Sequence, residues 1–355
     1  MKLRTLSIAS VLVCICTLLL QVSCSSGARS VHAPLATPAS PRTPAEFRRA
    51  PDDTFLTYPE WFLVYSPREY ADFISENPPS EFPFLRHIGQ FWQGYGAVYD
   101  STKDTRRFNY AYHSMIWVIG ASMTGEYGAT RAYESLIGRA TEATRFGRMT
   151  PEDRLAADVA HEYASYLDKE PFYKFDYLTP CRRVWTDTPL LSANPLRSWE
   201  RKYFLTTQYL FKAGYGWLIK QGSESAYGIE SKYTVVVLDR DPSAAMTELK
   251  TLQQFPDGAS LVQMPRYQAF TPAAMALAKS NARFLEIAGN SGPILITAIV
   301  PNNFSLPDST LLFTQPIITH PGHKRIAFTV PVPHLSDALL RLNDPAIQLE
   351  HVYDF

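Results

Sequence analysis

Cysteine is scarce in this sequence, with 4 residues among 355. Cys14, Cys16 and Cys24 lie within the first 24 positions, and Cys181 is the fourth. A chain that loses an N-terminal leader would keep Cys181 and at most Cys24. Two cysteines do not make a disulfide framework, which excludes the small disulfide-dense folds.

An excess of charge of one sign is also lacking. Lys and Arg together number 34, as do Asp and Glu, so the formal net charge is zero. We find no cluster of basic residues that would concentrate a field attractive to a polyanion. The sequence therefore predicts no nucleic-acid partner.

Four common motifs of catalysis and cofactor binding are missing. The chain has no GxSxG nucleophile elbow, no GxGxxG after a strand, no phosphate-binding GxxxxGK[ST], and no CxxC beyond the leader. The first three motifs place a nucleophile or a phosphate group, and the fourth supports redox chemistry. Their absence disfavours the common hydrolase, nucleotide-binding and thioredoxin-like classes, and we expect no cofactor.

The first 24 residues have the three parts of a secretion signal. Lys2 and Arg4 supply positive charge, Leu6–Leu20 is apolar, and Gln21-Val-Ser-Cys24 follows. Small residues before a cysteine resemble a bacterial lipobox, which implies lipidation of Cys24, although Gln21 stands where that motif has an aliphatic residue. We expect a periplasm-facing lipoprotein anchored to a membrane of the cell envelope, and the alternative is an uncleaved signal anchor.

Composition and periodicity divide the chain into four parts. Residues 1–24 are the leader, and residues 25–54 are a Pro-rich tether whose composition cannot bury enough surface to fold. Residues 55–227 read as an aromatic-rich helical domain. Residues 228–355 read as an α+β domain, because the period changes to that of strands from Tyr233 onward.

The stretch Phe108–Phe146 is predicted to be the central helix of the helical domain. Bulky residues from Tyr112 to Tyr127 and small residues from Ser114 to Ser135 form two neighbouring stripes at helical spacing. We expect the small stripe to accept a close helix, with a bend near Glu126, and the alternative is a helix inserted in a membrane. The other predicted helices are Ser66–Ile74 with Pro67 at its start, Phe82–Tyr99, Thr150–Leu167 and Arg197–Lys220, with a loop from Pro171 to Pro195.

The C-terminal part alternates strand and helix patterns. A β run at Tyr233–Leu238 is followed by a helix that Asp241-Pro242 would cap and that extends to Leu252. Further segments give the order β-α-β-α-β-β-β-β-α-β. This order predicts an α+β fold, and its last part suits a ferredoxin-like arrangement. The remaining expected elements are strands at 260–264, 284–288, 294–300, 311–318, 326–331 and 347–353, and helices at 271–280 and 334–342.

A loop near residue 190 carries the candidate ligand contacts. Loops rich in Trp, Asp, Asn and Arg often line clefts. Asp187 and Asn194 have an alternative role, which is to cap a turn and the following helix. The candidate residues are Trp185, Asp187, Asn194, Trp199 and Arg201.

Five residues are candidates for catalysis, each with a structural alternative. His161 and Glu162 share a helical face that could bind a metal or simply face solvent. Cys181 precedes two arginines, which can lower a thiol pKa, although a buried inert thiol is the alternative. His113 and Glu126 could form an acid–base pair only if their helix bends toward a cleft.

His320 and His323 flank a Pro-Gly turn that we place at a hairpin tip. Two imidazoles alone do not complete a zinc site, so we expect an exposed turn with no metal.

Several segments of the helical part resemble a group of bacterial membrane or envelope proteins that has no assigned activity. The resemblance carries no catalytic residue or cofactor, and it favours association with a membrane. The segments are Tyr58-Pro-Glu-Trp61, Met115–Ser122, Glu126-Tyr127 and Tyr133-Glu-x-x-Ile-Gly-Arg139.

Together these observations favour a non-enzymatic binding or accessory module of the envelope. Its partners would be the membrane, through the N-terminal anchor, and a protein or small apolar ligand. One alternative is a hydrolase with its site in the helical domain. The other is a membrane-embedded protein.

Overall fold

The computed structural model describes residues 41–49, 57–104, 108–145, 148–226, 232–242, 249–306 and 309–353. These residues belong to one compact unit, Ser40–Phe355. The proposed leader, Cys24 and most of the tether lie outside the described residues.

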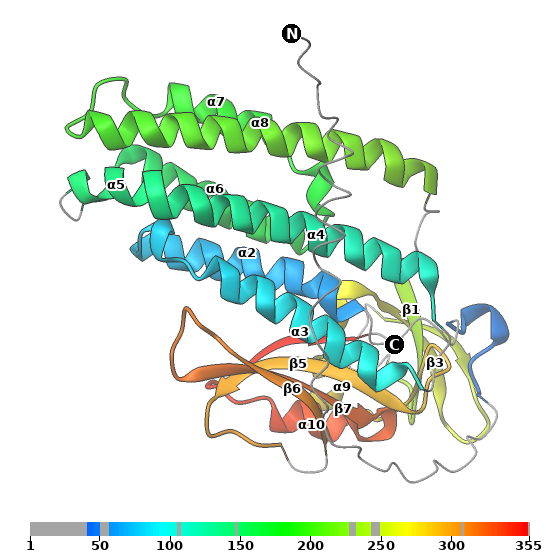
Figure 1. The fold of residues 1–355 in the computed structure, drawn as a ribbon. Coiled ribbons are helices and arrows are strands. Elements are labelled where there is room, and N and C mark those ends of the chain that lie inside the picture. Colours follow the sequence, from blue (N-terminus) through cyan, green and yellow to red (C-terminus); the bar gives the residue numbers. More distant parts are fainter. Residues whose placement is uncertain are drawn as a thin grey trace. The chain divides into compact units, whose positions relative to one another are not determined.

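The protein is a mixed α+β structure, with helices in the N-terminal half and antiparallel sheets in the C-terminal half (Figure 1). The helices of the first half are α2 Tyr58–Glu76, α3 Phe84–Thr102, α4 Tyr110–Tyr133, α5 Arg139–Glu142, α6 Pro151–Leu167, α7 Leu178–Thr186 and α8 Pro195–Ala226. Shorter turns are η2 Ala45–Phe47, η4 Pro79–Glu81, η6 Ala143–Arg145 and η7 Phe172–Lys174, and a π-helical segment, η5 Glu134–Gly138, continues α4.

Local capping signals explain where several helices begin. Thr150 and Asp153 form a capping box at the start of α6, as Thr150-Pro151 predicts. The prediction that Pro67 opens a helix is wrong, because α2 begins nine residues earlier and Pro59 occupies its first turn. The predicted loop 171–195 contains α7, whose start is fixed by hydrogen bonds from Leu178 N and Thr179 Oγ1 to Asp176.

Helix α4 buries its bulky stripe, as expected, with Ile116 and Met123 in a core shared with α2 and α3. The small stripe lies on the other side. Nothing comes within 4 Å of a Cβ built on Gly125 or Gly128, so the expected close helix is not there. The helix is continuous through Glu126, and it changes to π-helical geometry at Glu134–Gly138.

Two four-stranded antiparallel sheets make up the second half. Their strand orders are β2-β3-β1-β4 and β6-β7-β5-β8. In each sheet the strands therefore lie in the order second, third, first, fourth, counted along the chain. The strands are β1 Tyr233–Leu238, β2 Lys250–Gln254, β3 Ser260–Pro265, β4 Phe284–Ile287, β5 Pro293–Pro301, β6 Thr310–Pro316, β7 His323–Pro331 and β8 Gln348–Val352. The helices are α9 Phe270–Lys279 and α10 Leu335–Arg341, with short turns η8 Tyr267–Ala269 and η9 Val332–His334.

The prediction of a helix from Asp241 to Leu252 is wrong at its C-terminal end. Lys250–Gln254 forms strand β2, which pairs with β3, and residues 243–248 lie outside the described residues. The local signal of Asp241-Pro242 is overridden by pairing with a strand that comes later in the chain. Asp241 instead accepts a hydrogen bond from Thr251 Oγ1 at 2.9 Å.

Two hydrophobic cores use opposite faces of the second sheet. One core joins both sheets with α9 and α10, and Ile296 and Phe328 are among its members. The other core joins Leu295 and Ala327 of the same strands to the helices α2, α3 and α4. Strands β5 and β7 are therefore buried on both faces, and their long apolar runs reflect this position.

Candidate functional site

The candidate ligand contacts gather around α7 and the beginning of α8. The rings of Trp185 and Trp199 lie 6.0 Å apart, and both side chains are about half exposed. Trp185 Nε1 donates to Thr206 Oγ1 at 3.0 Å. This pair of indoles forms one end of a surface that continues along α8.

Asp187 and Asn194 occupy the capping positions that were their alternative roles. Asp187 is the residue that follows α7, and it accepts a hydrogen bond from Thr186 Oγ1 at 2.7 Å. Asn194 precedes α8, and its Oδ1 accepts from Arg197 N at 3.3 Å. The Asn194 side chain therefore helps to begin α8. The Asp187 side chain contacts the side chains of Thr186 and Arg183, and its backbone N–H donates to the Arg183 carbonyl at the end of α7.

Arg201 belongs to a buried ionic network between α8, α6 and the end of α4. Its Nη1 donates to Glu134 Oε1 at 2.8 Å, and its Nε donates to Glu200 at 2.8 Å. Three cations and four carboxylates lie close together, all nearly inaccessible to solvent. The members of this buried ionic network are Glu134, Glu152, Asp153, Arg197, Glu200, Arg201 and Lys202.

Three carboxyl groups of the network, those of Glu134, Asp153 and Glu200, have pKa values shifted in different directions. Burial opposes ionisation of Asp153, but Arg197 at 2.8 Å outweighs it and lowers the pKa of this carboxyl. The pKa of Glu200 is also lowered, because the pair with Arg201 outweighs burial. Burial prevails at Glu134 and raises its pKa although Arg201 is adjacent. Glu134 is thus the carboxyl that holds a proton most readily among these three.

The π-helical segment makes room for Glu134. A Cβ on Gly138 would lie 2.0 Å from Glu134 Oε2, so a larger residue here would displace this buried carboxylate. The carbonyl oxygen of Gly138 also accepts from Arg197 Nη1 at 3.1 Å. Single π-helical turns often occur at functional sites, and here the turn directs a carboxylate into the protein.

From Leu196 to Leu218 the charged residues of α8 are covered, and the outward side of this stretch carries no charge. Lys220, further along the helix, is exposed. Between Leu196 and Leu218, all of which the structure describes, no charged side chain is exposed. The large apolar side chains there are 47% to 69% exposed, which reverses the usual amphipathic pattern. The exposed positions are Leu196, Trp199, Tyr203, Thr207, Leu210, Phe211, Gly214, Trp217 and Leu218.

Helix α4 runs antiparallel beside α8 (Figure 1). It too exposes no charged side chain along its described length. Ser122 Oγ lies 2.7 Å from Tyr215 OH, and Lys212 Nζ lies 2.7 Å from Glu126. None of the charged side chains described between Tyr110 and Ile137 is exposed. We call the exposed positions of α8 together with those of α4 and η5 the outer face, and the latter are Tyr110, Ser114, Trp117, Val118, Gly125, Ala129, Ala132, Leu136 and Ile137.

His113 and Glu126 are engaged with different partners. His113 Nδ1 lies 2.8 Å from Tyr95 OH, and its ring stacks on Phe108 with centroids 3.9 Å apart. Burial lowers the pKa of His113. Glu126 pairs with Lys212, so both side chains have structural partners.

His161, Glu162 and Cys181, all within the described residues, share no hydrogen bond or ion pair with one another, and each has its own surroundings. His161 Nε2 is 2.9 Å from Ser75 Oγ, whereas Glu162 accepts from Arg183 Nη1 at 2.7 Å. Cys181 is half-buried with a free thiol, and burial raises its pKa, which disfavours the nucleophilic thiolate.

His320 and His323 lie at the connection between β6 and β7, as the Pro-Gly turn predicts, with ring centroids 4.4 Å apart. Among the described residues, no group of three or more His, Cys, Asp or Glu side chains could hold a metal ion.

A second buried cluster was not anticipated from the sequence. Arg325 of β7 donates to both carboxylate oxygens of Glu350 on β8 at 2.7 Å, and to Glu69 of α2 at 2.8 Å. His87 of α3 lies beside it, with Nδ1 2.9 Å from Ser66 Oγ. Burial and the nearby Arg325 lower the pKa of His87 to about 3. The cluster connects two helices to the second sheet.

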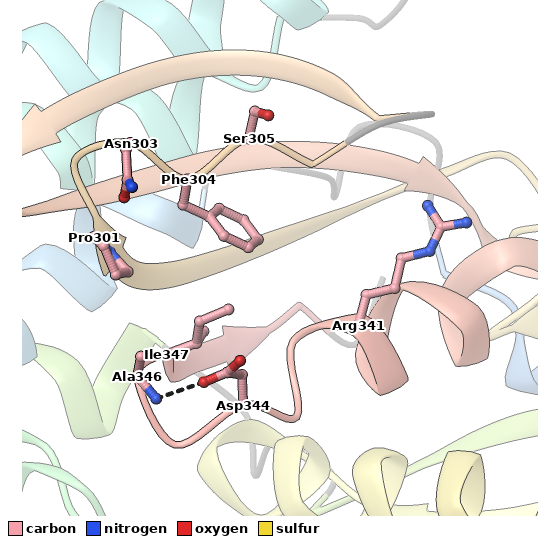
Figure 2. A pocket seen from close by; sticks show the side chains of 8 residues that line it. All are labelled: Pro301, Asn303, Phe304, Ser305, Arg341, Asp344, Ala346 and Ile347. Carbon is pink, nitrogen blue, oxygen red and sulfur yellow. Dashed lines mark hydrogen bonds between the residues drawn. The ribbon is translucent and has the colours of Figure 1, made fainter.

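A cavity of about 410 Å³ lies beside the start of β8 (Figure 2). Phe304 and Ile347 give it an apolar part, and Asn303, Ser305 and Arg341 surround it with polar groups. Asp344 Oδ1 accepts from Ala346 N at 2.8 Å and so belongs to the turn that forms one wall.

Comparisons with protein-family models, with curated proteins and with solved structures returned no match. Within the part of the chain that the structure describes, no helix is both long enough and apolar enough to cross a bilayer.

Proposed function

We propose that this protein is an exported, envelope-anchored binding or accessory module without catalytic activity, and that the outer face is its binding surface. One observation supports this proposal more than any other. Helix α8 directs Arg197, Arg201 and Lys202 into the protein and its large apolar side chains outward.

The stability of the isolated chain explains neither the buried cations of α8 nor its exposed apolar side chains. Buried ion pairs are weak sources of stability, because desolvation of the charges offsets much of their attraction. Large contiguous apolar surfaces on soluble proteins usually mark a contact with a partner or a membrane. An α8 that is covered on its outer side accounts for both features at once.

The enzyme alternative has less geometric support. A hydrolytic site needs a nucleophile within hydrogen-bond reach of a base that a third group orients. In the described part of the chain, His113 contacts Tyr95, His161 contacts Ser75, and the Cys181 thiol is partly withdrawn from solvent. These contacts suit structural roles.

We further propose a ferredoxin-like arrangement for the α+β part. Each sheet contains a helix between its third and fourth strands in chain order, with those strands separated by the first. This is the strand order of a split β-α-β unit. The same order in both sheets suggests two such units in tandem.

The proposed location depends on the leader and tether. A positive start, an apolar run and Cys24 favour export and attachment to a membrane. The chain would then face the periplasm on its Pro-rich tether, and the outer face would meet its partner there.

Site-specific photo-crosslinking in bacterial cells tests this proposal. The full chain would carry benzoylphenylalanine at Phe211, or at the control position Leu311, which is also exposed but lies on β6. We expect an adduct from Phe211 and none from Leu311. An envelope-located chain that gives no adduct at Phe211 would refute a binding role for the outer face, and a cytosolic chain that retains its leader would refute export.

A further inference from the structure

We infer that the outer face rests on the interfacial layer of a lipid bilayer, with α8 lying parallel to the membrane plane. This inference depends on the proposed function, and it names the partner of the same surface. It follows from the shape of the face, from its side-chain chemistry and from where the charges of α8 are placed.

The exposed positions of α8 form a straight, narrow stripe. Leu196, Tyr203, Leu210 and Trp217 recur every seven residues, and the other exposed positions lie beside them. At 100° per residue they all fall within an arc of about 120°, over a length of about 33 Å. A stripe of this shape can lie along a flat surface over its whole length.

The side chains of the stripe suit the boundary between lipid head groups and acyl chains. Trp199 and Tyr203 lie toward its N-terminal end, and Trp217 lies toward its C-terminal end. Trp and Tyr gather at membrane interfaces, because each ring is apolar and carries one polar group. Between them, Leu210 and Phe211 have no polar atom and are 52% and 69% exposed, which fits deeper contact with acyl chains.

The placement of the charges supports a lipid contact. A helix on a membrane surface normally keeps its charged side toward water. In α8 that side is directed into the protein, where Arg197 pairs with Asp153 and Arg201 pairs with Glu134. From Leu196 to Leu218 the outer side can then approach lipid without the desolvation of any charge.

A second copy of the chain is a weaker explanation of the stripe. Helices that pair through a seven-residue repeat use charged residues beside the seam to set partner and register. No exposed charged side chain lies beside this stripe between Leu196 and Leu218, a range that is described throughout. The expected anchor also favours lipid, because the 17 residues from Cys24 to Pro41 can span up to about 60 Å.

Quenching of tryptophan fluorescence by brominated lipid tests the inference. The full-length chain would be reconstituted in vesicles of phosphatidylethanolamine and phosphatidylglycerol with plain or brominated acyl chains. We expect strong quenching in brominated vesicles. A variant with Trp117, Trp199 and Trp217 all changed to Phe removes the exposed indoles of the outer face and should lose most of it. The variant Trp61→Phe/Trp92→Phe, which alters two partly buried indoles, should retain it. Equal unfolding midpoints would show that both variants remain folded.

Two outcomes would overturn the inference and leave the proposed function intact. One is the absence of quenching at Trp199 and Trp217 although Phe211 gives protein adducts in the photo-crosslinking experiment. The other is efficient disulfide formation between copies of a Leu210→Cys variant, which would assign the face to a second copy of the chain. Loss of the photo-crosslinks altogether would instead refute the proposed function.

Discussion

Arg201 Nη1 of α8 donates a hydrogen bond to Glu134 Oε1 at 2.8 Å, and both side chains are buried. This pair connects the longest described helix to the π-helical turn that follows α4. It also explains how an apolar outer side and a charged inner side coexist on α8. From Leu196 to Leu218 the charged side chains of α8 have partners within the protein, so the exposed side of that stretch carries no charge.

Arg201→Leu should destabilise the protein strongly. Removal of Arg201 leaves the buried Glu134 without its cation, while Glu200 keeps Arg197. An unpaired buried charge costs about 3–5 kcal/mol. Arg183→Leu is the matched control, because the pair of Arg183 with Glu162 is partly exposed and such pairs contribute at most about 1 kcal/mol. Denaturant unfolding measures both, and equal losses would contradict the importance of the buried network.

Glu69→Gln should weaken the attachment of the helices to the second sheet. Glu69 accepts from Arg325 at 2.8 Å across elements that are 256 positions apart in the sequence. We expect a loss of about 1–3 kcal/mol in the free energy of unfolding, because Arg325 loses one charged partner but keeps Glu350. The control Glu76→Gln lies exposed at the end of the same helix and should change little. A similar stability for both variants would show that Arg325 does not hold this interface.

Gly120→Ala and Gly125→Ala should have opposite effects. A Cβ on Gly120 would lie 2.4 Å from Phe91 Cε1, whereas Gly125 has open space. Overpacking at Gly120 should cost about 1–3 kcal/mol. At Gly125 alanine should stabilise the helix by about 0.5–1 kcal/mol, because glycine is a poor helix former. Thermal unfolding of the two variants tests this, and a loss at Gly125 would indicate that another backbone packs there.

Acidification should destabilise the protein through His87. Its pKa is lowered from 6.5 to about 3, so the folded state binds a proton less readily than the unfolded state. The resulting stability is complete above pH 6.5 and is lost as the pH falls from there toward 3, by at most about 1.4 kcal/mol per pH unit. His87→Gln should flatten the dependence between pH 6.5 and pH 4. An unchanged slope in that variant would assign the effect to other groups.

The parts of the fold that were predictable from sequence are those set by neighbouring residues. Thr150-Pro151 and Asp153 fix the start of α6 through contacts within four positions, and alternation or apolar runs identified most strands. Strand β2 was missed because Asp241-Pro242 resembles a helix start, whereas pairing with β3 decides its conformation.

The candidate site was less predictable from sequence. Helical periodicity shows which residues share a face of α8, but it does not show whether that face is buried or exposed. The apolar positions of α8 were visible in the sequence, but an apolar stripe normally faces a core. Only the placement of Glu134 and Asp153 shows that the inner side is the charged one. The contact between Arg325 and Glu69 could not be predicted from sequence, because the two residues belong to segments far apart in the chain.

The most direct test of the central claim is the accessibility of Leu210 in spheroplasts. A Leu210→Cys variant and a control Leu311→Cys variant, both with Cys181→Ser, would be treated with a membrane-impermeant maleimide. Mass spectrometry of the peptide that carries each new cysteine would measure labelling before and after detergent. Both positions are more than half exposed in the isolated chain, at 52% and 55%. The account predicts that the cysteine at 210 is protected until detergent is added, whereas the one at 311 is labelled throughout. Equal labelling of both positions before detergent would contradict it.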